Sequence, residues 1–264
     1  MTVRFSILGS GSRGNSVYIE SGRTGILVDA GFSGKEMQSR LHKIGRDLHD
    51  VQAIFLTHEH NDHIGGVGVL SRKYRIPAYA NPGTFAAGEA RLGRLFSRME
   101  FETGSEVAIG DLLVRSFSVS HDTADPVGFV VSDAQNSIGY CTDTGKVSHL
   151  MARRLSGCNA LILEFNHNLE MLKNGPYPLP LQQRVRSSKG HLSNEDAATF
   201  LAELMGEHVH SVVLAHLSET NNTPRLAREA AQLAVREWGD TALLLALQDA
   251  ALPLLNISEK ERRS

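Results

Sequence analysis

The sequence predicts an α/β fold in which two β-sheets are covered by helices. Three observations favour it. The chain of 264 residues is 41% hydrophobic, enough for one full core. Short apolar, β-branched runs alternate with amphipathic ones, and no repeat or low-complexity linker divides them. We therefore expect one domain over residues 1–257 and a charged, disordered tail at 258–264.

Strands are expected first as a meander and later between helices. Residues 3–8, 17–20 and 25–29 are short apolar runs separated by glycine-rich turns, as in antiparallel strands. Further strands are predicted at 53–56, 78–80, 112–119, 128–131, 137–141, 160–163 and 212–215. The spacing of apolar residues predicts helices at 33–44, 64–74, 194–205 and 224–238. Asn194 is also a candidate for the cap of its helix.

Charge, cysteine content and hydropathy exclude several classes of protein. Lys and Arg number 27 against 29 Asp and Glu, which excludes a globally basic nucleic-acid coat but allows a local basic patch. Cys141 and Cys158 form neither a disulfide scaffold nor a CxxC metal site, as is usual in a reducing compartment. The apolar run before Gly9 is too short for a signal peptide, and no run is long enough to span a bilayer. We therefore expect a soluble, cytoplasmic protein without a membrane partner.

Histidines gather directly after the predicted strand at 53–56. His58, His60 and His63 stand with Asp62 in the run HEHNDH. Protonated imidazoles would repel one another, whereas neutral imidazole and carboxylate groups are good ligands of a divalent cation. His58 and His60 can face one ion, and Asp62 and His63 a second, with further ligands needed from elsewhere. The alternative is a chance cluster on a solvated loop.

This run resembles the H-x-H-x-D-H motif of the metallo-β-lactamase fold superfamily, and the resemblance continues along the chain. In that superfamily the remaining ligands follow later strands, as His121, Asp143 and His216 do here. The resemblance implies an αββα sandwich of two mixed sheets covered by helices. It implies that Asp29, at a strand end, orients a neighbouring ligand. It also implies two divalent ions, held by His58, His60 and His121 and by Asp62, His63 and His216, with Asp143 bridging.

Finer features resemble the YycJ/WalJ-type metallohydrolases within that superfamily. They lie at residues 8–16, 163–168, 175–178 and 190–194 and in the histidine run, where Asn61 replaces the Ser common in the branch. The branch contains DNA exonucleases, which implies a nuclease that cleaves phosphodiesters through a metal-activated hydroxide. The implied substrate is nucleic acid, DNA in preference to RNA. Zinc suits the histidine-rich ligands, and such sites also accept manganese or iron.

Two residues are expected to be catalytic. His191 opens a segment that leads into the helix at 194–205. In related phosphodiesterases a comparable element supplies a histidine beside the scissile phosphate, which implies that His191 assists the leaving oxygen. The alternative is a structural histidine at the start of a helix. Asp62, which is also a candidate metal ligand, is the second.

Other polar residues are candidates for contact with the substrate. Residues 9–14 have the form GxGxxG, but a strand follows them, so they predict a tight turn rather than a dinucleotide site. Residues 173–189 are basic and lack acids, which is typical of a phosphate-binding segment or of a solvated lid, and they include Tyr177, an aromatic residue that can stack on a base. The candidate substrate contacts are Ser12, Asn15, His167, Arg184 and Arg186.

Two other functions remain open. A hydrolase of a small ester, thioester or lactone would use the same ligands, so the ligands alone do not discriminate. The basic stretch and the Gly-His-Leu-Ser segment at 190–193 favour a phosphodiester. A non-enzymatic metal sensor would lack ligands, and none is missing. No GxSxG or activated cysteine pattern suggests a side-chain nucleophile.

Overall fold

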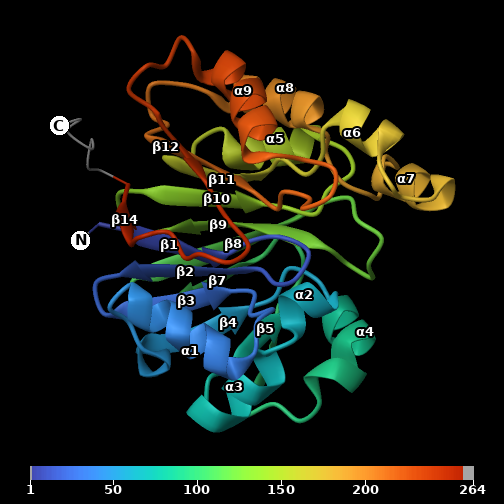
Figure 1. Ribbon diagram of the computed structural model, residues 1–264. Coiled ribbons are helices and arrows are strands. Elements are labelled where there is room, and N and C mark those ends of the chain that lie inside the picture. The colour runs from blue at the N-terminus through green and yellow to red at the C-terminus, as the bar shows by residue number, and fades with distance from the viewer. Residues whose placement is uncertain (1, 258–264) are drawn as a thin grey trace.

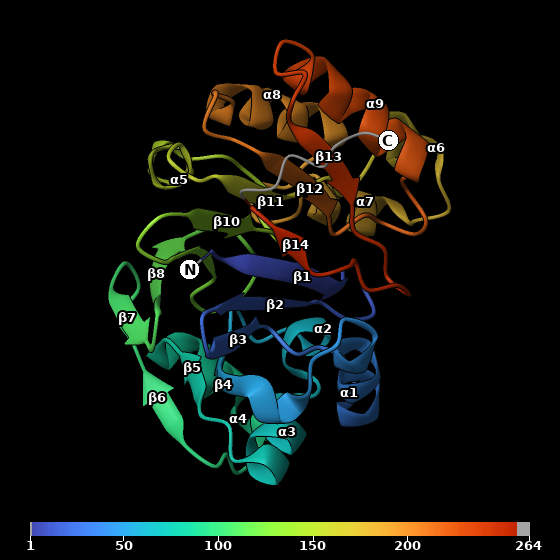
Figure 2. The same ribbon diagram turned by 90° about the vertical axis from the view of Figure 1, so that its left-hand side faces the viewer.

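The computed structural model describes residues 2–257 as four layers, in which two sheets face each other and helices cover both outer faces (Figure 1). The tail predicted at 258–264 lies outside the described residues. Figure 2 shows the same layers from the side, with α8 and α9 above the sheets and α1 and α3 below them. The predicted αββα sandwich is confirmed.

The first sheet has seven strands in the order β14-β1-β2-β3-β4-β5-β6. It begins as the predicted antiparallel meander and continues in parallel from β3 to β6. Because β2 pairs antiparallel with β1, the GxGxxG turn joins two strands and does not open a helix. The strands are β1 (Arg4–Gly9), β2 (Ser16–Ser21), β3 (Thr24–Val28), β4 (Val51–Phe55), β5 (Ala78–Ala80), β6 (Arg98–Glu100) and β14 (Leu255–Asn256).

The second sheet also has seven strands, in the order β13-β12-β11-β10-β9-β8-β7. It too is antiparallel at first, from β7 to β10, and parallel from β10 to β13. The strands are β7 (Glu106–Ile109), β8 (Leu112–Ser118), β9 (Val127–Ser132), β10 (Ser137–Cys141), β11 (Ala160–Glu164), β12 (Ser211–Ala215) and β13 (Ala242–Leu245).

Helices on the outer faces complete the apolar layers. The first sheet is covered by α1 (Gly34–Lys43), α3 (Val67–Tyr74) and α4 (Pro82–Leu92), and the second by α5 (His149–Leu155), α8 (Asn194–Leu204) and α9 (Pro224–Val235). The remaining helical segments are a 3₁₀ turn (Leu48–Asp50), α2 (Asn61–Ile64), α6 (Leu169–Asn174) and α7 (Leu179–Val185). Within residues 2–257, no helix is both long and apolar enough to cross a membrane.

The helix predicted at 224–238 ends at Val235, and two other predicted helix boundaries also need correction. The helix expected at 64–74 is two helices, because the chain turns at Gly65 and Gly66 between α2 and α3. A Cβ atom on Gly66 would collide with the carbonyl oxygen of Phe32, so only glycine allows this close approach. The cap of α8 is Ser193 rather than Asn194, and its hydroxyl accepts the backbone N–H of Asp196 at 3.0 Å.

The central strands are buried on both faces, since each lies between the other sheet and a layer of helices. In β2, Val17 and Ile19 face the second sheet while Tyr18 faces the helices. In β11, Ile162 faces the first sheet while Leu161 faces the helices. Strands buried in this way have continuous apolar sequences, which is why the central strands were predictable.

Candidate metal centre

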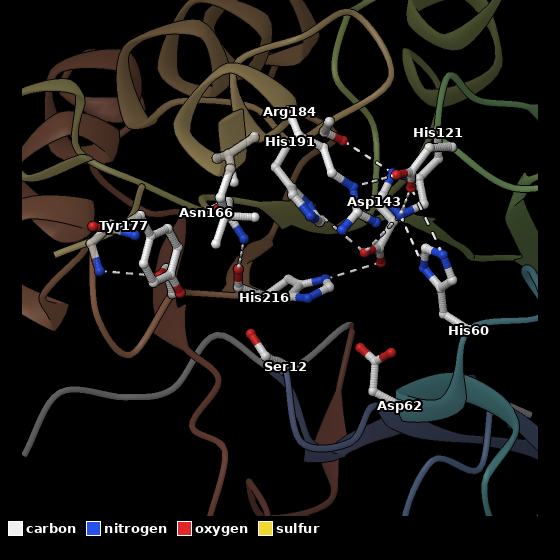
Figure 3. Close-up of a pocket in the computed structure, with 16 residues that line it drawn as sticks. Ser12, His60, Asp62, His121, Asp143, Asn166, Tyr177, Arg184, His191 and His216 are labelled. Carbon is white, nitrogen blue, oxygen red and sulfur yellow. Dashed lines mark hydrogen bonds and ion pairs between the residues drawn. The ribbon is translucent and has the colours of Figure 1, made fainter. Parts of the chain in front are cut away.

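The carboxyl ends of several strands meet at one edge of the sandwich, and the residues that follow them form the candidate site. The run from His58 to His63 follows β4, while His121, Asp143 and His216 follow β8, β10 and β12. Polar side chains from both sheets therefore face one another across this edge (Figure 3). Open α/β sheets generally place ligand sites at the carboxyl ends of their strands.

Three residues at these strand ends have a left-handed backbone. The φ angles are 59° at Asp29, 57° at Asp143 and 54° at His216. A non-glycine residue in this region costs on the order of 1–3 kcal/mol, and such strain is typical of functional sites. Hydrogen bonds hold two of these turns in place. Asp29 Oδ1 accepts the backbone N–H of Thr57 at 2.9 Å, and the N–H of His216 donates to Ser10 Oγ at 2.9 Å.

His58, His60 and His121 form the first group, in which one nitrogen from each ring lies within 4.8 Å of the others. His121 Nδ1 donates to the carbonyl of Gly190 at 3.1 Å, so its Nε2 is the ring nitrogen left to face a cation, 3.3 Å from His60 Nδ1. Burial and the charge of His63 lower the pKa of His58 well below its ordinary value. His58 Nε2 is buried and has no hydrogen-bond partner within the described range. A neutral imidazole with an unused nitrogen fits a divalent cation.

Asp143 lies between this group and a second set of histidines. Its Oδ2 is 2.9 Å from His216 Nδ1 and 3.3 Å from His63 Nε2, and its Oδ1 is 3.8 Å from His121 Nε2. Burial raises the pKa of the Asp143 carboxyl, but His216 and His63 outweigh it and hold that pKa well below its ordinary value. An ionised carboxylate with one oxygen toward each set can bridge two cations.

Asp29 and Asn15 hold the ligand candidates of the histidine run in position. Asp29 Oδ2 accepts a hydrogen bond from His63 Nδ1 at 2.7 Å, which turns His63 Nε2 toward Asp62 and Asp143. Asn15, expected near the substrate, is instead buried and does not line the pocket. Its Nδ2 donates to Asp62 Oδ2 at 3.1 Å, so it contacts a candidate ligand.

Glu164 is a site residue that the sequence analysis missed. Its Oε1 accepts from His191 Nδ1 at 2.7 Å, and its Oε2 accepts the backbone N–H groups of Thr144 and Leu192. Burial lowers the pKa of His191, but Glu164 outweighs this effect and raises it to about 9. Glu164, His191, Asp143 and His216 also lie close enough to form a second group of possible ligands. The available signal was an acid at the end of an otherwise apolar strand.

A cavity of about 280 Å³ opens over these groups. Ser12 lines it, as predicted for a substrate contact, and so does Arg184, although Arg184 Nε donates to Asp122 Oδ2 at 2.6 Å. His167 and Arg186 do not line it. His167 is buried, and burial lowers its pKa to about 4, whereas Arg186 is exposed.

Comparison with known proteins agrees with this architecture. Residues 24–217 match the family described as "Beta-lactamase superfamily domain". The chain is 40% identical over 241 residues to exodeoxyribonuclease YycJ of Bacillus anthracis, which covers 90% of this chain and 91% of the relative. It is 41% identical over 263 residues to exodeoxyribonuclease WalJ of Streptococcus pneumoniae serotype 2, which covers 96% and 98%.

A solved structure shares the fold at low sequence identity. The metallo-beta-lactamase fold protein YhfI of Bacillus subtilis is 15% identical, with a TM-score of 0.74 over 96% of this chain and 99% of that chain. At 15% sequence identity, this similarity shows a shared fold and nothing about function. By sequence and fold together, the chain belongs to the beta-lactamase superfamily and, within it, to the family of the YycJ and WalJ proteins.

Proposed function

We propose that the protein is a metal-dependent nuclease that hydrolyses DNA from its ends. One observation carries the proposal. A buried cluster of imidazole and carboxylate donors surrounds Asp143 beneath an open pocket, in a chain whose full-length relatives are named exodeoxyribonucleases. The chemistry of these donors suits divalent cations, and the preference for DNA over RNA rests on the relatives.

The proposal assigns the donors to two cation positions. When bound, divalent ions would lower the pKa of water and offset the negative charge of the reacting phosphodiester. Zinc suits this donor set, and manganese or iron are the alternatives. The residues that would hold the ions are His58, His60 and His121 at one position and Asp62, His63 and His216 at the other, with Asp143 shared.

His191 is proposed as the residue that assists the leaving oxygen. Its Nδ1 is held by Glu164, so Nε2 is the ring nitrogen left for the substrate. The Glu164 carboxylate raises the pKa of the ring, which favours the protonated form that proton donation requires. Glu164 is a positioning residue in this scheme, since it acts only through the ring of His191. Ser12, Arg184 and Arg186 are proposed to contact the DNA backbone, Ser12 and Arg184 from the wall of the pocket.

The test is hydrolysis by purified, metal-analysed protein supplied with Zn²⁺ or Mn²⁺. Labelled single- and double-stranded DNA, RNA of the same sequence and a small thioester serve as substrates, and Asp143→Asn is the matched inactive control. We expect nucleotides to be released from DNA ends, and a chelator to stop the reaction. Hydrolysis of the thioester with all nucleic acids intact would overturn the proposal in favour of a small-ester hydrolase. Hydrolysis of RNA alone would overturn the choice of DNA.

A further inference from the structure

One wall of the pocket differs in character from the rest. Tyr177, Leu181 and Val185 line it, whereas the remaining lining is mainly imidazole, carboxylate, amide and hydroxyl groups. Figure 3 shows Tyr177 at one end of the pocket and His60 and His121 at the other. Among the described residues, the one hydrogen bond of Tyr177 is at its backbone carbonyl, which accepts from Gln182 Nε2 at 2.9 Å. Its half-buried ring has no aromatic partner among residues 2–257 and remains available to a ligand.

This apolar wall is fastened to the loops that carry the candidate metal ligands. Arg184 Nε donates to Asp122 Oδ2 at 2.6 Å, next to His121. The backbone N–H of His191 donates to the carbonyl of Val185 at 2.9 Å. The wall is therefore held in place beside the metal centre.

A second attachment fixes the chain that follows α7. Ser120 Oγ donates to the carbonyl of Ser188 at 2.7 Å. Gly145 packs so closely against the turn at 187–190 that a Cβ atom there would collide with the Ser187 carbonyl. The residues after α7 are therefore held in place beside the loops that carry His121 and Asp143.

The size of the cavity supports the same conclusion. Its volume of about 280 Å³ lies at the lower limit of ligand pockets, which hold roughly 300–1,000 Å³. A pocket of this size is closer to a single nucleotide than to a stretch of duplex. Bases stack on aromatic rings in many proteins that bind single strands, and this contact needs no particular sequence.

We propose that this wall is a subsite for the terminal nucleotide, whose base stacks on Tyr177 while Leu181 and Val185 complete the apolar surface. The inference rests on the proposed DNA-end hydrolysis and adds what makes the site select an end. Tyr177 is then a specificity-determining residue, and the fixed position of α7 is what prevents a strand from passing through.

The test compares two DNA substrates that share the same scissile bond. One carries a normal terminal nucleotide and the other an abasic terminal nucleotide. The pair is made twice, once with the varied nucleotide at the 5′ end and once with it at the 3′ end. Tyr177→Ala should lower kcat/KM on the normal end by about 5- to 150-fold, the equivalent of stacking one base, and should change the abasic end by less than about twofold. Tyr177→Phe should retain the wild-type rate. Leu179→Ala is the matched control, because Leu179 lies on α7 but is 65% exposed and does not line the pocket.

If Tyr177→Ala loses rate equally on the normal and the abasic substrate, or on neither of them, the subsite is overturned, provided that metal content and Tm are unchanged. Cleavage of a covalently closed DNA circle by the wild type at the rate of linear DNA would overturn end selection. A wild-type protein inert on both substrates would overturn the proposed function, and this inference with it.

Discussion

Asp143 is the residue on which both halves of the candidate metal centre depend, because its two oxygens face different histidines. We predict that Asp143→Ala lowers bound metal from two ions per chain to one or fewer and abolishes hydrolysis. Elemental analysis after dialysis measures the first effect. Asp249→Ala, at a side chain that is 75% exposed, is the control and should keep both ions. Full occupancy in Asp143→Ala would contradict the bridging role.

The pair of His191 and Glu164 separates catalysis from metal binding. His191→Ala should keep both ions and lower kcat by about 10²- to 10⁴-fold, the usual contribution of a positioned acid, with little change in KM. The rate of His191→Ala should fall less on a nitrophenyl phosphodiester, because the leaving group of that substrate needs less protonation. Glu164→Gln should also be slower, and the double variant no slower than His191→Ala, since both residues act through one ring. Loss of metal from His191→Ala would instead make His191 a ligand.

At this scale, the sequence reveals some residues better than others. The histidine run was recognisable because its residue types and spacing have few structural explanations. Glu164 was not, because its role depends on His191, which lies 27 positions along the chain and reaches it only in the folded protein. The left-handed turns at Asp29 and Asp143 were equally hidden, since neither residue type requires a positive φ. Asn15 was expected at the substrate, but the turn before β2 places it beneath Asp62.

Among the elements, α7 and the residues that follow it carry the proposed contact with the DNA backbone. Log affinity falls as log salt rises. Replacing Arg184 and Arg186 together by Ala should make this fall less steep, by about 1 to 2 in slope, because each phosphate contact releases about one counterion. Binding is measured in an Asp143→Asn background to prevent hydrolysis. Arg225→Ala on α9, 73% exposed, is the control. An unchanged slope in the double variant would show that this segment is a solvated lid.

Glu20 joins β1, β2 and the loop after α1, far from the metal centre. It pairs with Arg4 and with Arg46, and accepts from the Tyr18 hydroxyl at 2.8 Å. Burial raises the pKa of Glu20, but Arg46, Tyr18 and Arg4 outweigh it and lower that pKa below its ordinary value of 4.5. A pKa that is lower in the folded than in the unfolded state stabilises the fold above the unfolded value. This stabilisation is lost as pH falls through the folded pKa.

It follows that Glu20→Gln should lower the free energy of unfolding by about 1–3 kcal/mol at neutral pH, the range for a lost hydrogen-bond partner of a charged group. The difference from the wild type should narrow as pH falls below about 4. Urea unfolding of the metal-free protein across this range measures it. A difference that stays constant with pH would contradict the account.

Elements were predictable where burial shaped their sequence. Central strands such as β4 and β11 have apolar runs because both their faces are buried. Strand β6 is exposed along its whole length, and α7 buries none of its residues. Neither sequence therefore shows a periodic pattern of apolar residues. In the sequence, the segment that we assign to the DNA end was therefore visible as a run of basic residues with one aromatic, Tyr177, and not as a helix.

For the molecule as a whole, the two-sheet arrangement makes the site possible. The first sheet supplies the histidine run after β4, and the second supplies His121, Asp143 and His216. Each sheet is antiparallel in one half and parallel in the other, so the carboxyl ends that carry these residues meet at one edge. The fold was predictable because the strand pattern and the histidine motif both indicate it. The apolar wall of the pocket was not, because it is held in place by contacts between segments that are distant in the sequence.

The central claim is that two metal ions at this edge enable hydrolysis of DNA ends. It is tested most directly by titrating the metal-free protein with Zn²⁺ or Mn²⁺ while bound metal and nucleotide release from a DNA end are measured together. The account predicts that release rises with the second ion and reaches its plateau at two ions per chain. Full hydrolysis at one ion per chain, or in the metal-free protein, would contradict it.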